Sequence, residues 1–238
     1  MVKSSGVPLL FGTDDVERVE GSDEVRFYNS AAFLTPDDIQ LRSYRKRRLV
    51  MFGEYIPFEK ALPFMKYLSP IGGSFTAGME PVQFTLQEGG HTIAPLICFE
   101  DSFPHGGREH VLSGTDLLVN LTNDGWFGTG PEQWQHAANA VFRAVENGVP
   151  LVRCANNGLT CWIDPFGRVR QFYGEESGDI YGAGFVSFDV LLGQTIGQTF
   201  YNRHGDVFGW TCLGWVLGVA GVRGFRAKRG LHTGGGIG

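Results

Sequence analysis

Residues 93–101 read Ile-Ala-Pro-Leu-Ile-Cys-Phe-Glu-Asp, an apolar run that ends in a cysteine followed by an aromatic residue and two acids. A continuous apolar run of this length is typical of a strand buried on both faces of an α/β protein. A thiol at the end of such a strand, where the chain turns toward a helix, is one way in which enzymes present a nucleophile. Cys98 is therefore a candidate nucleophile, although a lone strand cysteine is more often a buried structural thiol.

The acids beside Cys98 disfavour a thiolate, so a reactive Cys98 needs a cation nearby in the fold. The best source is a basic cluster at residues 44–50, Tyr-Arg-Lys-Arg-Arg-Leu-Val, which runs into Phe52-Gly53-Glu54-Tyr55-Ile56-Pro57. A thiol, a lysine and a carboxylate are the parts needed for acyl transfer. Taken alone, a basic cluster is usually a solvated surface.

The order of apolar segments predicts an α/β layered sandwich. Residues 131–147 form the clearest amphipathic helix, which Gly148 ends, and a short helix is expected at 107–112. Residues 82–86 and 92–98 predict an antiparallel pair joined through Glu88-Gly89-Gly90. Further strands are expected at 7–12, 25–34, 117–121, 151–154, 159–163, 168–173 and 185–190.

Composition narrows the function classes. The chain has 238 residues, 42% hydrophobic residues and a net charge of −5, which fits a globular protein and argues against nucleic acid as a partner. The four cysteines contain no C-x-x-C pair, and a turn at 155–158 would place Cys154 opposite Leu159, a register that does not favour a Cys154–Cys161 disulfide. The six histidines show no metal-ligand spacing and read as ordinary surface or helix residues. We expect neither a metal nor a cofactor.

The two ends of the chain differ. Residues 1–6 lack the apolar core of a signal peptide. Residues 207–222 carry no charge and are followed by Arg223, Arg226, Lys228 and Arg229. This stretch is slightly shorter than the about 17–25 residues that a spanning helix needs. A transmembrane helix and a buried helix of a soluble domain both remain open on composition alone.

Three blocks in one order carry a family resemblance. They are Tyr44-x-Lys46-x-x-Leu49-Val50-x-Phe52-Gly53-Glu54-Tyr55-x-Pro57; Leu96-Ile97-Cys98-Phe99-Glu100; and Asn123-Asp124-Gly125-Trp126-Phe127-Gly128 with Gln135-His136, Arg143-Ala144-Val145-Glu146 and Asn156-Asn157-Gly158. Together they resemble the carbon–nitrogen hydrolase (nitrilase) superfamily and, within it, the apolipoprotein N-acyltransferases. The resemblance runs from about Leu9 to the C-terminus.

The resemblance implies a nitrilase-like α-β-β-α sandwich over 1–195 that lacks its first strands, a transmembrane helix over 206–225 and a basic, glycine-rich tail over 226–238. It makes Cys98 the nucleophile, Lys46 the catalytic lysine and Glu54 a further essential carboxylate. Glu100 matches a supporting acid, and Trp126 with Phe127 matches a loop that borders the active site. Tyr55 is expected to join Phe58, Phe64 and this Trp-Phe pair in an aromatic pocket facing the membrane.

Two residues depart from the family pattern. Phe99 stands where the acyltransferases usually have tyrosine, and Met51 replaces a proline before Phe-Gly-Glu. No segment matches the motif of the family's general-base glutamate, and Glu17, Glu20 and Glu24 lie in a polar loop that does not fit that role. We therefore expect the general base to lie outside this chain, and the chain alone to be inactive.

The implied activity moves an acyl chain from a phospholipid to the N-terminal cysteine amine of an apolipoprotein through a thioester on Cys98. The implied partners are a phospholipid donor, an apolipoprotein acceptor and the bacterial inner membrane, with the catalytic domain on the periplasmic side. Two alternatives are a soluble amidase or nitrilase of the same superfamily, and a non-catalytic remnant that acts as a folded module.

Overall fold

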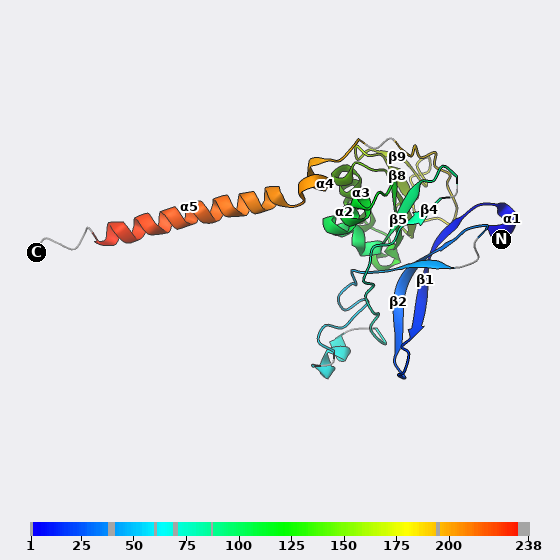
Figure 1. The fold of residues 1–238 in the computed structure, drawn as a ribbon, viewed down its shortest axis with the longest axis horizontal. Coiled ribbons are helices and arrows are strands. Elements are labelled where there is room, and N and C mark those ends of the chain that lie inside the picture. Colours follow the sequence, from blue (N-terminus) through cyan, green and yellow to red (C-terminus); the bar gives the residue numbers. More distant parts are fainter. Residues whose placement is uncertain are drawn as a thin grey trace, which may run out of the picture. The chain divides into compact units, whose positions relative to one another are not determined.

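The computed structural model describes residues 2–37, 41–59, 61–68, 71–86, 88–193 and 196–232. The chain divides into two compact units, Met1–Asn202 and Arg203–Gly238, and the first contains both sheets (Figure 1). The short helix α1 (Val2–Ser5) precedes the first strand, and α4 (Phe200–His204) lies at the border between the two units.

The larger sheet has six strands in chain order. They are β4 (Phe84–Thr85), β5 (Thr92–Ile97), β6 (Leu117–Asn123), β7 (Leu151–Asn156), β8 (Cys161–Ile163) and β9 (Val169–Phe172). The central strands β5, β6 and β7 run parallel, while β4, β8 and β9 are antiparallel to their neighbours. Each of these strands was predicted, and the antiparallel pairing of β4 with β5 is confirmed.

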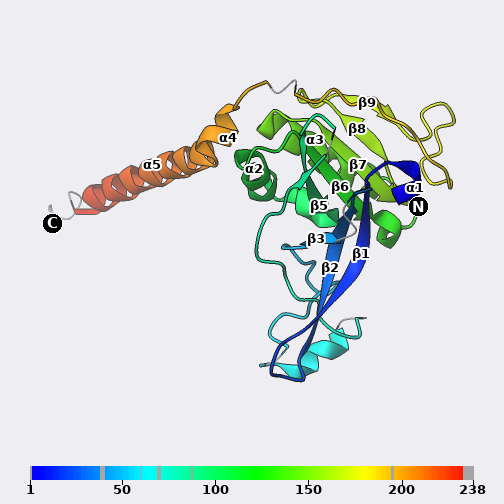
Figure 2. The same ribbon diagram turned by 45° about the vertical axis from the view of Figure 1, so that its right-hand side comes forward.

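The smaller sheet is an antiparallel meander of β1 (Leu9–Arg18), β2 (Val25–Leu34) and β3 (Arg42–Arg45). Figures 1 and 2 show β1 and β2 as a long twisted hairpin (blue). One face of this sheet packs on the six-stranded sheet through a buried apolar cluster of Ala31, Phe33, Tyr44, Phe84, Ile93 and Ile97. This inter-sheet core lies directly beneath the end of β5 and therefore positions the residue that follows it.

Two helices cover the other face of the six-stranded sheet. Helix α2 (Pro104–Leu112) follows β5, and α3 (Glu132–Asn147) connects β6 to β7. Ala137, Ala140 and Ala144 of α3 pack against a core that includes Leu118 and Leu151. Gly148 ends α3 in a left-handed conformation with a φ of 68°, as the sequence predicted. The layered α/β sandwich is therefore confirmed.

Among the described residues, three 3-10 helices complete the first unit. Helix η1 (Pro63–Leu68) lies in the loop between the sheets, η2 (Cys98–Ser102) follows β5, and η3 (Asp124–Phe127) follows β6. Because β5 and β6 are parallel neighbours, η2 and η3 begin at the same edge of the sheet. This edge brings the Cys98 block and the Trp126-Phe127 block together.

Two local predictions were wrong. Residues 185–190 form no strand, because their alternating pattern finds no ladder partner among the described residues, and Phe185 is 92% exposed. The hairpin β7–β8 pairs Arg153 with Cys161, so Cys154 does not face Leu159. Cys154 and Cys161 are both free thiols.

The second unit consists mainly of α5 (Val207–His232). Residues 207–224 of α5 have a mean hydropathy of 1.2, and the helix is long and apolar enough to cross a membrane. Eighteen helical residues span about 27 Å, close to the about 30 Å of a bilayer's hydrocarbon core.

Candidate active site

Cys98 lies where β5 ends and η2 begins. It has a φ of 52°, a left-handed conformation that is uncommon for any residue with a side chain and that recurs at functional sites. The Asn120 side chain of β6 donates a hydrogen bond of 3.3 Å to the Cys98 carbonyl. The thiol is free and partly exposed. Cys98 thus lies at the end of a strand, where the chain turns into a helix, as the sequence predicted, and it is more exposed than the buried Cys161.

Lys46 directly follows β3, and its side chain is fully buried. Its Nζ donates a hydrogen bond of 2.7 Å to Glu54 Oε1. Glu54 also accepts hydrogen bonds of 2.8 Å from Asn29 Nδ2 and from the Val50 backbone N–H. An ammonium group without water is stable only beside a charge-assisted acceptor, so Glu54 holds Lys46 both electrostatically and sterically.

The arginines beside Lys46 behave differently. Arg45 pairs with Asp15 and Glu17 on the hairpin, and Arg47 pairs with Glu109 of α2 at 2.6 Å. These guanidinium groups are partly exposed, so the surface interpretation of a basic cluster holds for them and fails for Lys46 alone. Alternation along the chain decides this, because neighbouring residues of extended backbone point to opposite faces.

Glu100 joins the Cys98 segment to the Lys46 segment. Its carboxylate accepts hydrogen bonds from the backbone N–H groups of Ile97 (2.8 Å), Arg47 (2.7 Å) and Arg48 (3.1 Å), and from the Tyr44 hydroxyl (2.9 Å). Burial raises the pKa of Glu100, and these hydrogen bonds partly offset that increase. The contacts favour a supporting role over direct contact with a substrate.

Cys98 lies between two cavities. The first, of about 650 Å³, has an apolar wall that includes Met51, Phe52, Phe99, Trp126 and Phe127 and a polar wall on α3 that includes Glu132, Gln135, His136 and Asn139. The second, of about 710 Å³, lies between the sheets. Both are also lined by Gly53, Glu54, Asn123 and Trp126. A substrate in either cavity could therefore reach the Cys98 thiol.

The predicted aromatic pocket is only partly formed. Trp126 and Phe127 line the first cavity, and both are largely exposed. Tyr55, Phe58 and Phe64 line neither cavity, and Phe58 is 74% exposed on the loop that leads to η1. The backbone carbonyl of Tyr55 instead accepts a hydrogen bond of 2.8 Å from the Phe52 N–H. This bond shapes the turn that carries Glu54.

The acids considered for the general base lie away from the thiol. Glu17 accepts a hydrogen bond from Tyr28 and pairs with Arg45, and hydrogen bonding to Tyr28 lowers its pKa. Glu20 and Glu24 line neither cavity. Asp14 of β1 does line the second cavity, together with Cys98 and Glu54. Sequence reasoning missed Asp14, because only the register of β1 against Asn29 turns it toward the site.

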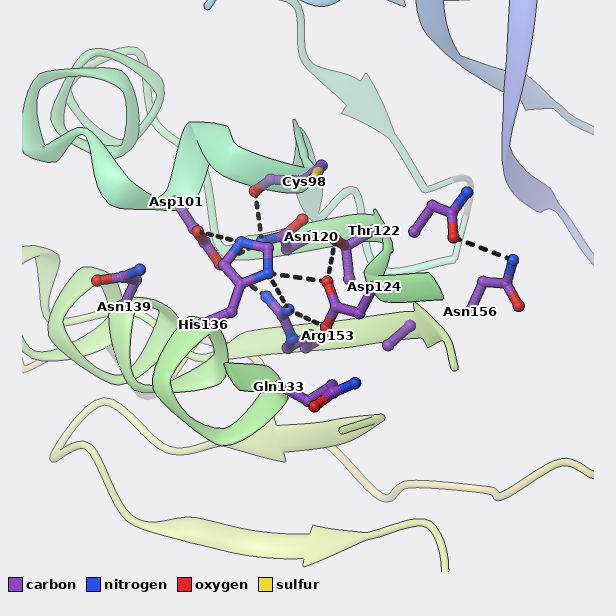
Figure 3. A network of polar contacts seen from close by, with 12 residues as sticks. Cys98, Asp101, Asn120, Thr122, Asp124, Gln133, His136, Asn139, Arg153 and Asn156 are labelled. Carbon is purple, nitrogen blue, oxygen red and sulfur yellow. Dashed lines mark hydrogen bonds and ion pairs between the residues drawn. The ribbon is translucent and has the colours of Figure 1, made fainter. Parts of the chain in front are cut away.

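Figure 3 shows a network of buried polar groups beneath Cys98. Asp101 of η2, Asp124 of η3 and Arg153 of β7 have fully buried side chains, and His136 of α3 is 8% exposed. The histidines were expected to be ordinary surface or helix residues. His136 and His110 do lie on helices, α3 and α2, but both are buried, His110 completely. The available signal was Arg153, a charge inside an apolar strand.

Within the described residues, no group of three or more His, Cys, Asp or Glu side chains has an arrangement that could hold a metal ion. The site combines a partly exposed thiol, a buried ammonium and two cavities.

Comparisons with known proteins agree with the fold. A family model described as carbon–nitrogen hydrolase matches residues 1–183. The apolipoprotein N-acyltransferase of Geobacter metallireducens is 41% identical over 206 residues, covering 87% of this chain and 38% of the relative. The enzyme of the same name from Chlorobaculum tepidum is 36% identical over 239 aligned positions, covering 93% of this chain and 43% of the relative.

The chain thus spans about two fifths of the length of these curated relatives. A solved structure with a similar fold is an amidase of the nitrilase superfamily from Nesterenkonia AN1, with a TM-score of 0.50 and 22% identity. The match covers 72% of this chain and 58% of the amidase. It supports a nitrilase-like fold and is too distant to support a substrate.

Proposed function

Because this chain belongs to the carbon–nitrogen hydrolase family, we propose that it carries the nucleophile and lysine of an apolipoprotein N-acyltransferase. The observation that supports this most directly is Lys46, fully buried and paired with Glu54, on a segment that Glu100 ties to the turn holding Cys98. The relatives at 41% and 36% identity bear the acyltransferase name, which favours transfer over the amidase alternative.

In the first step, the Cys98 thiolate attacks the ester carbonyl of a phospholipid. The new S–C bond forms, the ester C–O bond breaks, and the departing lysophospholipid oxygen takes up the proton that the base removed from the thiol. Lys46 supplies positive charge to the thiolate and to the oxyanion of the tetrahedral intermediate. The base is a carboxylate that we expect outside this sequence.

In the second step, the α-amine of a lipid-modified N-terminal cysteine attacks the thioester. The amide C–N bond forms, the C–S bond breaks, and the proton lost by the amine returns to the Cys98 sulfur by way of the base. Trp126 and Phe127 line the first cavity and would exclude water, which favours transfer over hydrolysis. Glu54 and Glu100 act as positioning residues.

The helix α5 would anchor this site at the bacterial inner membrane. The basic residues Arg223, Arg226, Lys228 and Arg229 follow the uncharged stretch, and by the positive-inside rule they stay in the cytoplasm. The residues before Asp206, Cys98 among them, would then lie on the periplasmic side. This orientation would place the thiol beside its phospholipid donor.

A chimera tests the proposal. Residues 1–238 replace the matched segment of the Geobacter metallireducens relative, and the purified chimera is incubated with acyl-labelled phospholipid vesicles. We expect a hydroxylamine-sensitive label on Cys98 that moves to an acceptor lipopeptide. Cys98→Ala should abolish the label, while Cys212→Ala on α5 should keep it. A label on another cysteine, or release of free fatty acid with no acylated acceptor, would contradict the proposal.

A further inference from the structure

Four buried charged side chains lie beneath Cys98: Asp101, Asp124, His136 and Arg153, here called the buried quartet (Figure 3). Arg153 connects two of them, because its Nη1 lies 2.7 Å from Asp101 Oδ2 and its Nη2 lies 2.7 Å from Asp124 Oδ2. Two carboxylates thus face one guanidinium. A buried charge without a partner is costly, so this arrangement calls for a second positive charge.

His136 is placed to supply that charge. Its Nδ1 lies 2.8 Å from Asp124 Oδ1, and its Nε2 lies 3.2 Å from Asp101 Oδ1. Each ring nitrogen thus lies near a carboxylate oxygen: Nδ1 within a hydrogen bond, and Nε2 at ion-pair distance without the geometry of a hydrogen bond. Only the imidazolium form has a proton on both nitrogens and a charge for the second carboxylate. Although burial disfavours the charged ring, the Asp101 and Asp124 carboxylates raise the pKa of His136 to about 9.

The contact between Arg153 and His136 would instead favour a neutral imidazole ring. Arg153 Nη2 lies 2.9 Å from His136 Nδ1, and it could donate there only if Nδ1 carried no proton. The same Nη2 already donates to Asp124 Oδ2 at 2.7 Å, and an unprotonated Nδ1 would face the lone pairs of Asp124 Oδ1. The contact with Asp124 therefore decides the protonation state of the ring, and His136 Nδ1 donates to Asp124 Oδ1.

The buried quartet connects the two walls of the candidate site. Asp101 belongs to η2, the helix that Cys98 begins, and Asp124 begins η3, the helix that carries Trp126 and Phe127. Asn120 of β6 strengthens the first connection, since its Nδ2 donates to Asp101 Oδ2 at 2.5 Å and to the Cys98 carbonyl at 3.3 Å. Thr122 strengthens the second by donating to Asp124 Oδ1 at 2.9 Å.

We infer that His136 is a positioning residue, whose imidazolium locks the Cys98 helix η2 to the Trp126-Phe127 helix η3 through Asp101 and Asp124. The effect of this lock on acyl transfer rests on the proposed function. In that reaction, the lock would set the distance between the Cys98 thiol and the Trp126-Phe127 wall that excludes water. The lock itself is a property of the folded chain. It opens when the ring loses its second proton, because one buried negative charge then has no partner.

The charged groups that face the His136 ring come from three packed elements. Asp101 faces it from η2, Asp124 from η3 and Arg153 from β7. The other titratable groups are Glu132 and Arg143 on its own helix, and Glu54 and Cys98, which line the same cavity. Of these, Arg143 donates to the Asp101 carbonyl at 2.6 Å and pairs with Glu146, so its charge is already balanced.

Hydrogen exchange of the purified 238-residue chain in detergent, read by mass spectrometry, tests the lock. In His136→Gln and in Asp124→Asn, peptides covering η2 and η3 should exchange together about tenfold faster, the scale of coupling between contacting groups. The matched control is His91→Gln, since His91 also faces a carboxylate, Asp116 at 3.5 Å, but on the protein surface. The control should leave both peptides unchanged.

A pH profile separates a lock from simple packing. After correction for intrinsic exchange, the wild type should lose protection in η2 and η3 together as the pH rises through about 9, and His136→Gln should show no such step. A wild type without the step, or a step in only one of the two helices, would overturn the inference. If His136→Gln does not fold, the wild-type profile and Asp124→Asn decide.

No lipid substrate enters these measurements. A missing step would therefore refute the lock and leave acyl transfer on Cys98 untouched. An unlabelled chimera would refute the proposed function and leave the lock standing.

Discussion

Lys46 Nζ lies 2.7 Å from Glu54 Oε1, and the lysine side chain is fully buried while its arginine neighbours pair at the surface. The ammonium is buried beside the turn that lines both cavities around Cys98. A buried ion pair is weak evidence for stability, because desolvation offsets most of the attraction. It is more informative about function, since a buried positive charge stabilises a transition state most where negative charge develops during the reaction.

Replacing Lys46 should therefore act on the reaction. In the chimera, we expect Lys46→Arg to lose at least about 10²-fold in thioester formation, nearly as much as Lys46→Ala. A planar guanidinium cannot take the place of a compact ammonium against Glu54. Lys66→Arg is the matched control, because Lys66 is exposed and pairs loosely with Glu59 at 3.5 Å. Near-normal rates in Lys46→Arg would reduce Lys46 to a structural charge.

Replacing Glu100 should lower the stability of the fold. Glu100→Gln removes charge-assisted acceptors for the N–H groups of Arg47 and Arg48, and we expect a loss of about 2 kcal/mol in the free energy of unfolding. The control Glu109→Gln removes only a half-exposed partner of Arg47, for which we expect at most about 0.5 kcal/mol. Urea unfolding of both variants measures the difference. Equal losses would show that Glu100 does not join the two segments.

His110 should make the fold sensitive to acid. Neither of its ring nitrogens has a hydrogen-bond partner among the described residues, and burial, with help from the charge of Arg47, lowers its pKa from 6.5 to about 4. The unfolded chain then takes up this proton at higher pH than the folded chain does. The stability associated with neutral His110 is fully present above pH 6.5 and is lost as the pH falls toward 4.

The variant His110→Phe checks this sign. It keeps an aromatic ring against Tyr44, whose ring centroid lies 5.7 Å away. Between pH 6.5 and 4, the free energy of unfolding should fall less steeply in the variant than in the wild type. Parallel slopes would mean that His110 is not the group that titrates.

The general base gives a prediction for the isolated chain. Glu54 is held by Lys46, and Asp14 is the other carboxylate lining the second cavity, on an exposed edge of β1. If the base lies outside this sequence, the purified chain should form thioester far more slowly than the chimera. Fast acylation of Cys98 in the chain alone would contradict this, and its loss in Asp14→Asn would then assign the base to Asp14.

The orientation of α5 can be read with fusions. A cytoplasmic reporter attached after Arg229 should be active, and a periplasmic reporter at the same place should be silent, because the basic residues that follow Val222 stay inside. Both fusions are made in the chimera, where the control fusion after Gly205, before the helix, should show the reverse pattern. Recovery of the whole chain in the soluble fraction without detergent would refute the membrane assignment.

Local pattern was enough to find most elements of this protein and its candidate nucleophile. The apolar run 92–97, the amphipathic helix 132–147 and the glycine at its end carry their structural cause in their own residues, since periodicity and left-handed caps are properties of a few neighbours in the chain. Cys98, Lys46 and Glu54 were found through the order of the motifs around them.

Tertiary structure decided which charges are buried and what they hold. Lys46 is buried and Arg45 is not because the register of β3 against β2 assigns their faces. The quartet around Arg153 forms only when strands β5, β6 and β7 lie side by side and α3 packs over their ends, so residues far apart in sequence meet. Residues 185–190 have the alternation of a strand but no partner among the described residues, and hydrogen bonding between strands cannot be read from one strand alone.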